Sequence, residues 1–166
     1  YGKVIGGGMP VGAFGGRKDI MQHISPVGNV YQAGTLSGNP IAMIAGYTVL
    51  SELKNRPGIY EELEEKTGYL RDGLDRVFSA WGQPYRINQL GSMISVHFSD
   101  HPVKDFTSAS GANNGLFKLF FHSMLRRGIY LPPSAFESWF LNNALGRADL
   151  DATVKAAQES LAELNG

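Results

Sequence analysis

Glycine is unevenly distributed along this chain of 166 residues, which contains 21 glycines. Most of them fall before residue 47 or at the ends of expected elements, and the run IGGGMPVGAFGG at residues 5–16 leaves only short apolar groups between them. Glycine has no side chain to bury, and ordering it costs more conformational entropy than ordering any other residue. We therefore predict that residues 1–38 form short strands joined by tight loops, and that this segment cannot fold by itself.

The bulk composition excludes several classes of protein. A hydrophobic content of 43% is typical of a soluble globular protein, and no apolar run approaches the roughly 20 residues needed to cross a bilayer. The 15 basic and 15 acidic residues balance, which makes nucleic acid a poor candidate partner. The absence of cysteine excludes disulfides, thiolate metal sites and a cysteine nucleophile. It is also compatible with a reducing cytoplasm, which is the location that we expect.

A helix is predicted to begin directly after the glycine-rich segment. Asn39 is suited to the N-cap position and Pro40 to the first helical position. Residues 41–50 are apolar nearly all round, so we expect this helix to be buried. Its small residues should allow close packing against a neighbouring element.

From residue 57 onward the hydrophobic pattern alternates between helical and strand periods. Apolar residues recur on one face of an amphipathic helix from Ile59 to Val77, and Ile94, Val96 and Phe98 lie on one side of a strand. We expect the remaining chain to contain a surface connection at 100–114 ending in an asparagine cap, a helix at 116–125 closed by Gly128, a strand at 129–131, a loop at 132–146 and a helix at 150–164. This order indicates a compact α+β domain.

Lys3 is a candidate chemical group because a long glycine-rich, apolar run follows it. A lysine held against backbone and apolar side chains loses hydration, so its pKa falls and the neutral amine can attack a carbonyl carbon. A solvated lysine near a chain end is the alternative, and composition and spacing favour that alternative.

The segment YQAGTLSGNP at residues 31–40 is a candidate anion site. It places the Thr35 hydroxyl and flexible backbone donors before a helix N-terminus, whose partial positive charge attracts anions. Helix capping by Asn39 and Pro40 alone would explain the same residues.

The histidines and Glu137 give weaker evidence for a metal site or a catalytic group. The four histidines are scattered without metal-ligand spacing, so we expect no metal site. Glu137 stands among aromatic residues and would be partly desolvated there, which suits a proton donor or acceptor. A loop carboxylate that points into water is the alternative, and it is the one that the sequence favours.

Three stretches together resemble the class III aminotransferases, which are pyridoxal phosphate enzymes of fold type I. They are GKVIGGGMPVGAFGG at residues 2–16, YQAGTLSGNP at residues 31–40 and GIYLPPSAFE at residues 128–137. The likeness covers essentially the whole chain. It implies an α/β fold in which residues 1–56 are the end of the large cofactor domain with its connecting helix, and residues 57–166 are the small C-terminal α+β domain.

The same resemblance implies roles for individual residues. Lys3 would be the Schiff-base lysine that holds pyridoxal 5'-phosphate and shuttles protons. Thr35 and the Gly34 backbone would bind the cofactor phosphate of the neighbouring subunit of a homodimer, with Tyr31 near that pocket. Glu137 would lie close to the cofactor.

Within the family, the likeness is to members that move an amino group from C2 to C1 of glutamate 1-semialdehyde. The product is 5-aminolevulinate, a tetrapyrrole precursor, and the pyridoxamine form of the cofactor takes part in the cycle. This chain alone should be inactive, because the other cofactor contacts lie upstream in the family. The alternatives are a class III aminotransferase with a separate amino acceptor and a noncatalytic dimerisation module.

One departure from the family pattern falls after Glu137. Many members read Ser-x-Ala-His there, whereas this chain has Asn142-Asn143-Ala144-Leu145. No histidine can act at position 145. If that imidazole is required for the mutase reaction, Leu145 favours the aminotransferase; a lineage-specific variant is the interpretation that we prefer.

Overall fold

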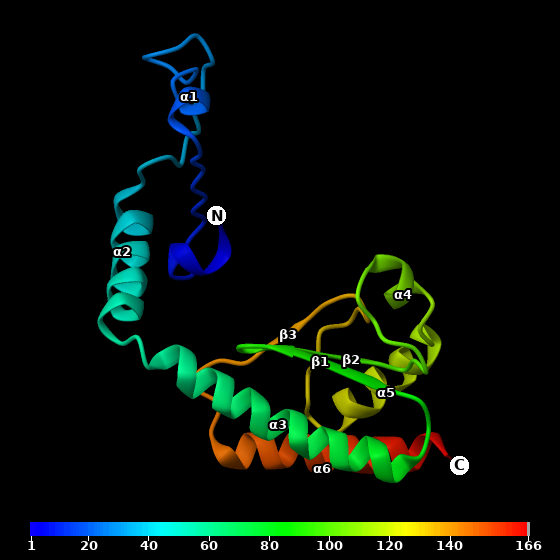
Figure 1. Cartoon of the computed structure of the whole chain (residues 1–166). Helices are drawn as coiled ribbons and strands as arrows, with labels where there is room; N and C mark the ends of the chain where they lie inside the picture. The colour runs from blue at the N-terminus through cyan, green and yellow to red at the C-terminus, as the bar shows by residue number, and fades with distance from the viewer. Residues whose placement is uncertain (166) are drawn as a thin grey trace. The chain divides into compact units, whose positions relative to one another are not determined.

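A break in helical structure at Arg56 and Pro57 separates two units of the computed structural model, which describes residues 1–165. The first unit is Tyr1–Pro57 and the second is Gly58–Gly166 (Figure 1). Proline cannot continue the helix that precedes it, since it lacks an N–H and disfavours a helical conformation in the residue before it. Each unit is described by itself.

The first unit contains little regular structure before residue 40. A 3-10 helix η1 (Lys3–Gly6) and a single helical turn α1 (Lys18–Met21) are followed by helix α2 (Pro40–Asn55). The strands predicted within residues 1–38 are absent there, apart from one isolated bridge between Ile24 and Val30. That prediction is wrong because the backbone hydrogen bonds of the segment are mostly local turns, so no ladder extends beyond the bridge.

Helix α2 begins as predicted. The Asn39 side chain accepts hydrogen bonds from the N–H groups of Ile41 and Ala42, each at 3.1 Å, and Pro40 occupies the first turn. These contacts satisfy two of the N–H groups that a helix start leaves without an intrahelical partner. The prediction of a start at Asn39 and Pro40 is confirmed.

The prediction that this helix is buried is wrong for this chain. Only Ala42 and Gly46 of α2 are buried. The large apolar side chains on its other faces are exposed, namely those of Ile41, Met43, Ile44, Tyr47 and Leu50. Hydrophobicity all round a helix predicts burial, but the main partner of α2 within the first unit is the short helix η1.

The one buried face of α2 packs tightly against η1, as its small residues suggested. A Cβ atom at Gly46 would lie 2.5 Å from the carbonyl oxygen of Ile5, which is far inside van der Waals contact. Glycine at this position therefore lets the helix approach the backbone that immediately follows Lys3.

The second unit pairs helices with a three-stranded sheet. Its elements are α3 (Ile59–Trp81), β1 (Arg86–Leu90), β2 (Met93–His97), α4 (Phe106–Ser110), α5 (Asn114–Arg126), β3 (Trp139–Phe140) and α6 (Arg147–Leu164). The strands are antiparallel in the order β1-β2-β3. Figure 1 shows α3, α5 and α6 on one side of the sheet and α4 on the other. The prediction of a small α+β arrangement in this part of the chain is confirmed.

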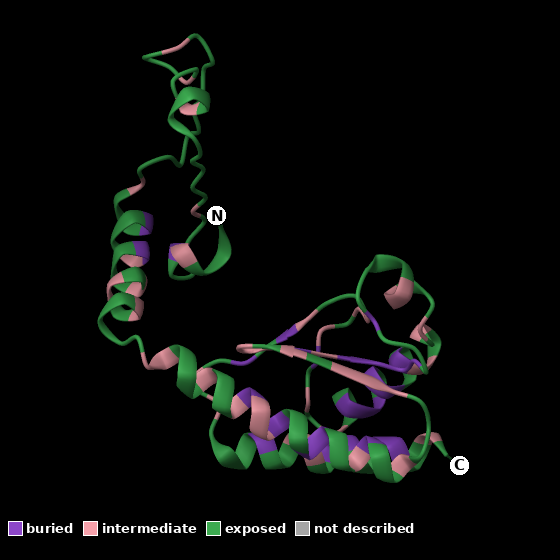
Figure 2. Ribbon diagram, viewed as in Figure 1, coloured by how far each residue is buried: buried purple, intermediate pink, exposed green. Residues whose placement is uncertain are grey.

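Aromatic rings form the centre of the core in the second unit. Phe78 on α3 is fully buried, and its ring centroid lies 5.7 Å from that of Phe98 and 5.6 Å from that of Phe120. Ile94 and Val96 add to this side of the sheet, as the alternation predicted. Figure 2 shows the buried residues concentrated where these helices meet the sheet. Such a core supplies the apolar burial that stabilises a small domain.

Two local predictions in the second unit are wrong. Residues 129–131 form no strand, because the Ile129 N–H donates to the Met124 carbonyl and so completes the end of α5. The third strand lies instead at Trp139–Phe140, inside the stretch predicted as a loop. A strand of two residues is too short to show alternation in a sequence.

No helix within residues 1–165 is long and apolar enough to cross a membrane.

Candidate functional site

Lys3 opens η1 with an unusual backbone. Its φ angle is 52°, in the left-handed region, and it is the only non-glycine residue with positive φ among the described residues. That region is unfavourable for residues with a Cβ atom, and such strain is often found at functional sites. The side chain is exposed. This exposure agrees with the alternative of a solvated lysine near a chain end.

The loop before α2 carries hydrogen-bond donors without partners inside the chain. Gly34 and Thr35 are exposed, and neither the Thr35 hydroxyl nor the two backbone N–H groups donates a hydrogen bond within residues 1–165. Tyr31 precedes them with its side chain 82% exposed. Free donors next to the N-terminus of a helix of 16 residues suit an anionic group such as phosphate.

Glu137 belongs to the second unit, in a turn where its N–H donates to the Ser134 carbonyl at 3.1 Å. Its side chain is exposed. The structure thus agrees with the alternative of a loop carboxylate in water rather than with a desolvated one. Phe106 and Phe136 stack beside it with ring centroids 5.6 Å apart.

A cavity of about 290 Å³ adjoins Glu137. It is walled by the outer face of the sheet, by the segment that leads into α4 and by the turn that holds the glutamate. Its lining includes Asn88, Ser95, His97, Lys104, Phe106 and Phe136. The sequence-predicted residues Lys3, Tyr31, Gly34 and Thr35 belong to the first unit, and Glu137 belongs to the second.

His97 is the residue of this cavity that sequence reasoning missed. Strand alternation places it opposite Val96 and Phe98, on the sheet face away from the core, where a polar residue suggests exposure to water. It is nevertheless only 7% exposed. The segment from Val103 to Ala109 lines the same cavity, and strand alternation gives no signal that the following loop returns to this face of the sheet.

The imidazole of His97 is incompletely hydrogen-bonded. Its Nε2 atom lies 3.2 Å from the Ser95 hydroxyl, whereas Nδ1 is buried without a partner. Burial lowers the pKa of His97 below its usual value of 6.5, so the ring is neutral near pH 7. A buried polar atom without a partner is costly and calls for an explanation.

Leu145, at the position of the family's histidine, has a packing role. It is half-buried against the hydrophobic core of the second unit, and its N–H lies 3.4 Å from the Asn142 carbonyl. The neighbouring Asn143 carbonyl accepts a hydrogen bond of 2.9 Å from the Lys66 ammonium on α3. An apolar residue at 145 thus fits the fold of this chain.

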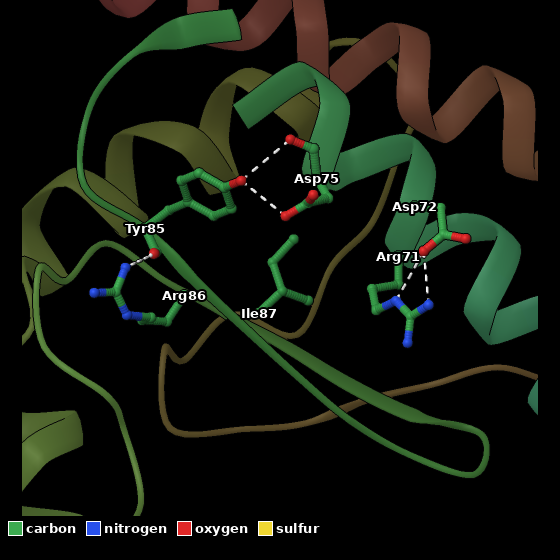
Figure 3. Close-up of a pocket in the computed structure, with 6 residues that line it drawn as sticks. All are labelled: Arg71, Asp72, Asp75, Tyr85, Arg86 and Ile87. Carbon is green, nitrogen blue, oxygen red and sulfur yellow. Dashed lines mark hydrogen bonds and ion pairs between the residues drawn. The ribbon is translucent and has the colours of Figure 1, made fainter. Parts of the chain in front are cut away.

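A larger cavity of about 550 Å³ is lined by side chains of α3 and of the segment that opens β1 (Figure 3). Its charged groups already have partners. Arg86 donates to the backbone carbonyls of Tyr85 and Asp100, while Arg71 pairs with Asp72 at 2.7 Å. The Tyr85 hydroxyl bonds to the Asp75 carboxylate at 2.8 Å, and burial is the main cause that raises the Tyr85 pKa. These internal bonds make it a poor ligand site.

No group of three or more His, Asp or Glu side chains gathers as metal ligands within residues 1–165.

A family model described as "Aminotransferase class-III" matches residues 1–145 of the chain. Glutamate-1-semialdehyde 2,1-aminomutase from Flavobacterium johnsoniae is 55% identical over 156 residues, which are 94% of this chain and 36% of that protein. The chain therefore spans little more than a third of the length of this curated relative.

Solved structures share the fold. An omega-transaminase from Sphaerobacter thermophilus superimposes with a TM-score of 0.84 at 27% identity, covering 99% of this chain and 38% of that one. A glutamate-1-semialdehyde-aminomutase from Pseudomonas aeruginosa PAO1, in complex with PMP, gives a TM-score of 0.71 at 21% identity. It covers 82% of this chain and 31% of that one. The fold is therefore that of a part of these enzymes.

Proposed function

Because the chain belongs to the class-III aminotransferase family, we propose that the full-length protein converts glutamate 1-semialdehyde to 5-aminolevulinate for tetrapyrrole synthesis. The observation that carries this proposal is the 55% identity to a curated aminomutase across 94% of the chain. The solved omega-transaminase is only 27% identical over nearly the same span, so the sequence favours the mutase over the transaminase.

The residues of the first unit suit pyridoxal 5'-phosphate. An exposed primary amine with a left-handed backbone, at Lys3, can bond covalently to an aldehyde. The Gly34 and Thr35 N–H groups and the Thr35 hydroxyl are uncommitted donors that suit a phosphate, and Tyr31 adds an exposed ring. When bound, the cofactor supplies an electron sink for the carbanion that forms at the substrate carbon.

Lys3 would hold the cofactor between turnovers and act as the proton carrier within them. An amine that is released from the cofactor is free to accept a proton from one carbon and return it to another. Gly46 supports this role, since the close approach of α2 fixes the backbone at Ile5, two residues after Lys3. Glu137 would accept hydrogen bonds from amino groups on the substrate, because its exposed carboxylate has no partner within residues 1–165.

The overall reaction is an isomerisation, so no separate amino acceptor is consumed. The amino group leaves C2, and C1 ends with an amino group in place of its aldehyde oxygen, while C2 becomes the ketone. A single base that reaches both carbons can carry the proton between them. Lys3 is our candidate for that base.

We also propose that the enzyme is a cytoplasmic homodimer in which Gly34 and Thr35 serve the phosphate of the partner's cofactor. The exposed apolar residues of the first unit support an assembly of this kind, because such patches usually mark contact surfaces. Sedimentation of the full-length protein tests the dimer directly.

The test of the activity uses purified full-length protein with glutamate 1-semialdehyde and no added amino acceptor. We expect 5-aminolevulinate to form with many turnovers per subunit. Product that forms only after an amino donor and acceptor are supplied would identify a transaminase instead. Absence of product under both conditions would favour a noncatalytic module.

A further inference from the structure

The backbone that follows Lys3 packs against α2 through two glycines, one on each side of the contact. A Cβ atom at Gly46 of α2 would lie 2.5 Å from the carbonyl oxygen of Ile5. A Cβ atom at Gly7, directly after η1, would lie 2.6 Å from the carbonyl oxygen of Ala45. Both distances are below 3.0 Å, which Cβ atoms in proteins essentially never show. A side chain at either position would therefore force η1 and α2 apart.

This contact occupies one face of α2. Its two buried residues, Ala42 and Gly46, are four positions apart and so lie on the same face of the helix. Val49 continues that face, because its Cγ2 atom would lie 3.0 Å from a Cβ atom at Gly7. On the other side, Gly6 is the buried residue of η1. The packing is thus largely backbone against backbone, which leaves few flexible side chains to absorb an added group.

Lys3 lies between two fixed points of this backbone. Before it, the Tyr1 carbonyl accepts a hydrogen bond of 2.9 Å from the Ala13 N–H. After it, the Ile5 carbonyl is held against Gly46. The φ angle of 52° at Lys3 is unfavourable for a residue with a Cβ atom, and such a conformation persists only where the surrounding structure enforces it. The direction in which the lysine side chain leaves the backbone therefore depends on the contact with α2.

We propose that Gly7 and Gly46 are positioning residues for the Lys3 amine. By holding η1 against α2, they set the point at which Nζ meets the aldehyde of the cofactor, and they act through the backbone rather than through a contact with the cofactor. The inference rests on the proposed function in one respect, since it takes Lys3 to be the cofactor lysine. It goes beyond that function by assigning control of the covalent link to the packing between η1 and α2.

Two forms of the cofactor separate positioning from the integrity of the pocket in the full-length protein. Pyridoxamine 5'-phosphate has no aldehyde, so its dissociation constant, measured by calorimetry, does not depend on a bond to Lys3. Borohydride added at successive times after pyridoxal 5'-phosphate, followed by peptide mass mapping, measures the rate of attachment to Lys3. In Gly46→Ala we expect an unchanged dissociation constant and an attachment rate that is lower by about a hundredfold, the cost of a displacement of about 1 Å.

A second variant and a matched control complete the test. Gly7→Ala should give the same result, because its Cβ atom would meet α2 from the opposite side. Gly68→Ala also replaces a helical glycine by alanine, but on α3, where no atom of residues 1–165 outside its own helix lies within 4 Å of the added Cβ atom. It should leave both measurements unchanged. Alanine favours a helix more than glycine does, so unwinding of α2 would not explain a loss in Gly46→Ala.

Attachment at the wild-type rate in both Gly46→Ala and Gly7→Ala would overturn the positioning role. A parallel loss of affinity for pyridoxamine 5'-phosphate would also overturn it, since that loss would indicate general damage to the pocket. So would an equal loss in Gly68→Ala. The proposed function fails separately, because a wild type that acquires the adduct on Lys3 but makes no 5-aminolevulinate would exclude the mutase and leave the role of the glycines intact. Absence of the adduct from the wild type would contradict both.

Discussion

The two units of the chain differ in how far their large apolar side chains are buried. In the second unit, Phe78, Phe120 and Leu74 are fully buried around one core. In the first unit, Tyr31, Ile44 and Tyr47 are 82%, 59% and 69% exposed, and only small residues are buried in α2. The second unit therefore has the apolar burial that stabilises a fold, while the first carries the candidate cofactor lysine and phosphate donors.

We expect the largest difference between the two units when each is expressed separately. We expect residues 58–166 to unfold in one cooperative transition, because their core is complete within the unit. Residues 1–57 should show no such transition, since glycine-rich segments with little burial cannot offset their conformational entropy. Circular dichroism during urea titration measures both. Cooperative unfolding of residues 1–57 alone would contradict the account.

Truncations of one large apolar side chain in each unit should differ strongly in their effect on stability. Phe78→Ala should destabilise residues 58–166 by about 3–5 kcal/mol, because it removes a fully buried ring. Ile44→Ala in the chain of 166 residues should change the free energy of unfolding by less than about 0.5 kcal/mol, since that side chain is exposed. Denaturant midpoints at constant slope give both values. Similar losses for the two variants would remove the distinction.

Substitutions at the helix N-caps should also affect the two units differently, but with a smaller change in the free energy of unfolding. Asn113 accepts a hydrogen bond of 3.0 Å from the Leu116 N–H at the start of α5, as Asn39 does for α2. Asn113→Ala should lower the free energy of unfolding of the second unit by about 1 kcal/mol. Asn39→Ala should reduce only the helical signal of α2. Equal effects on the main unfolding transition would show that the units are coupled.

An acid titration gives the smallest of these effects. Hydrogen bonds from Ser123, at 2.7 Å, and from Arg127 lower the pKa of the Glu163 carboxyl from 4.5 to about 2. Its contribution to stability is therefore full above the unfolded pKa and is lost as the pH falls from about 4.5 to 2. The stability advantage of wild type over Glu163→Gln should shrink across that window. An advantage that is constant from pH 6 to 2 would exclude this carboxylate as the cause.

Local signals in the sequence predicted those elements that depend on short-range contacts. The Asn39 cap, the alternation through Ile94, Val96 and Phe98, and the end of α5 at Gly128 depend on short-range sterics and hydrogen bonds, so they can be read without a structure. The two-residue strand at Trp139 could not be predicted, because its pairing with Ile94 depends on residues 45 positions away.

The candidate site was less accessible to sequence reasoning than the fold. Lys3, Thr35 and Glu137 were identified through resemblance, and their roles stay predictions. The exposure of α2 could not be foreseen, since an apolar helix signals that a partner exists and not where it lies. His97 was missed because alternation predicts an exposed side chain on that face of β2, whereas residues of the following loop line the same cavity.

The central claim is that Lys3 is the cofactor lysine of a glutamate-1-semialdehyde aminomutase. Borohydride reduction of the full-length protein with pyridoxal 5'-phosphate, followed by peptide mass mapping, tests it most directly. We predict one reduced adduct per subunit, on the peptide that contains Lys3, and its loss in Lys3→Ala but not in Lys18→Ala. No adduct, or an adduct on Lys18 or Lys54 that persists in Lys3→Ala, would contradict it.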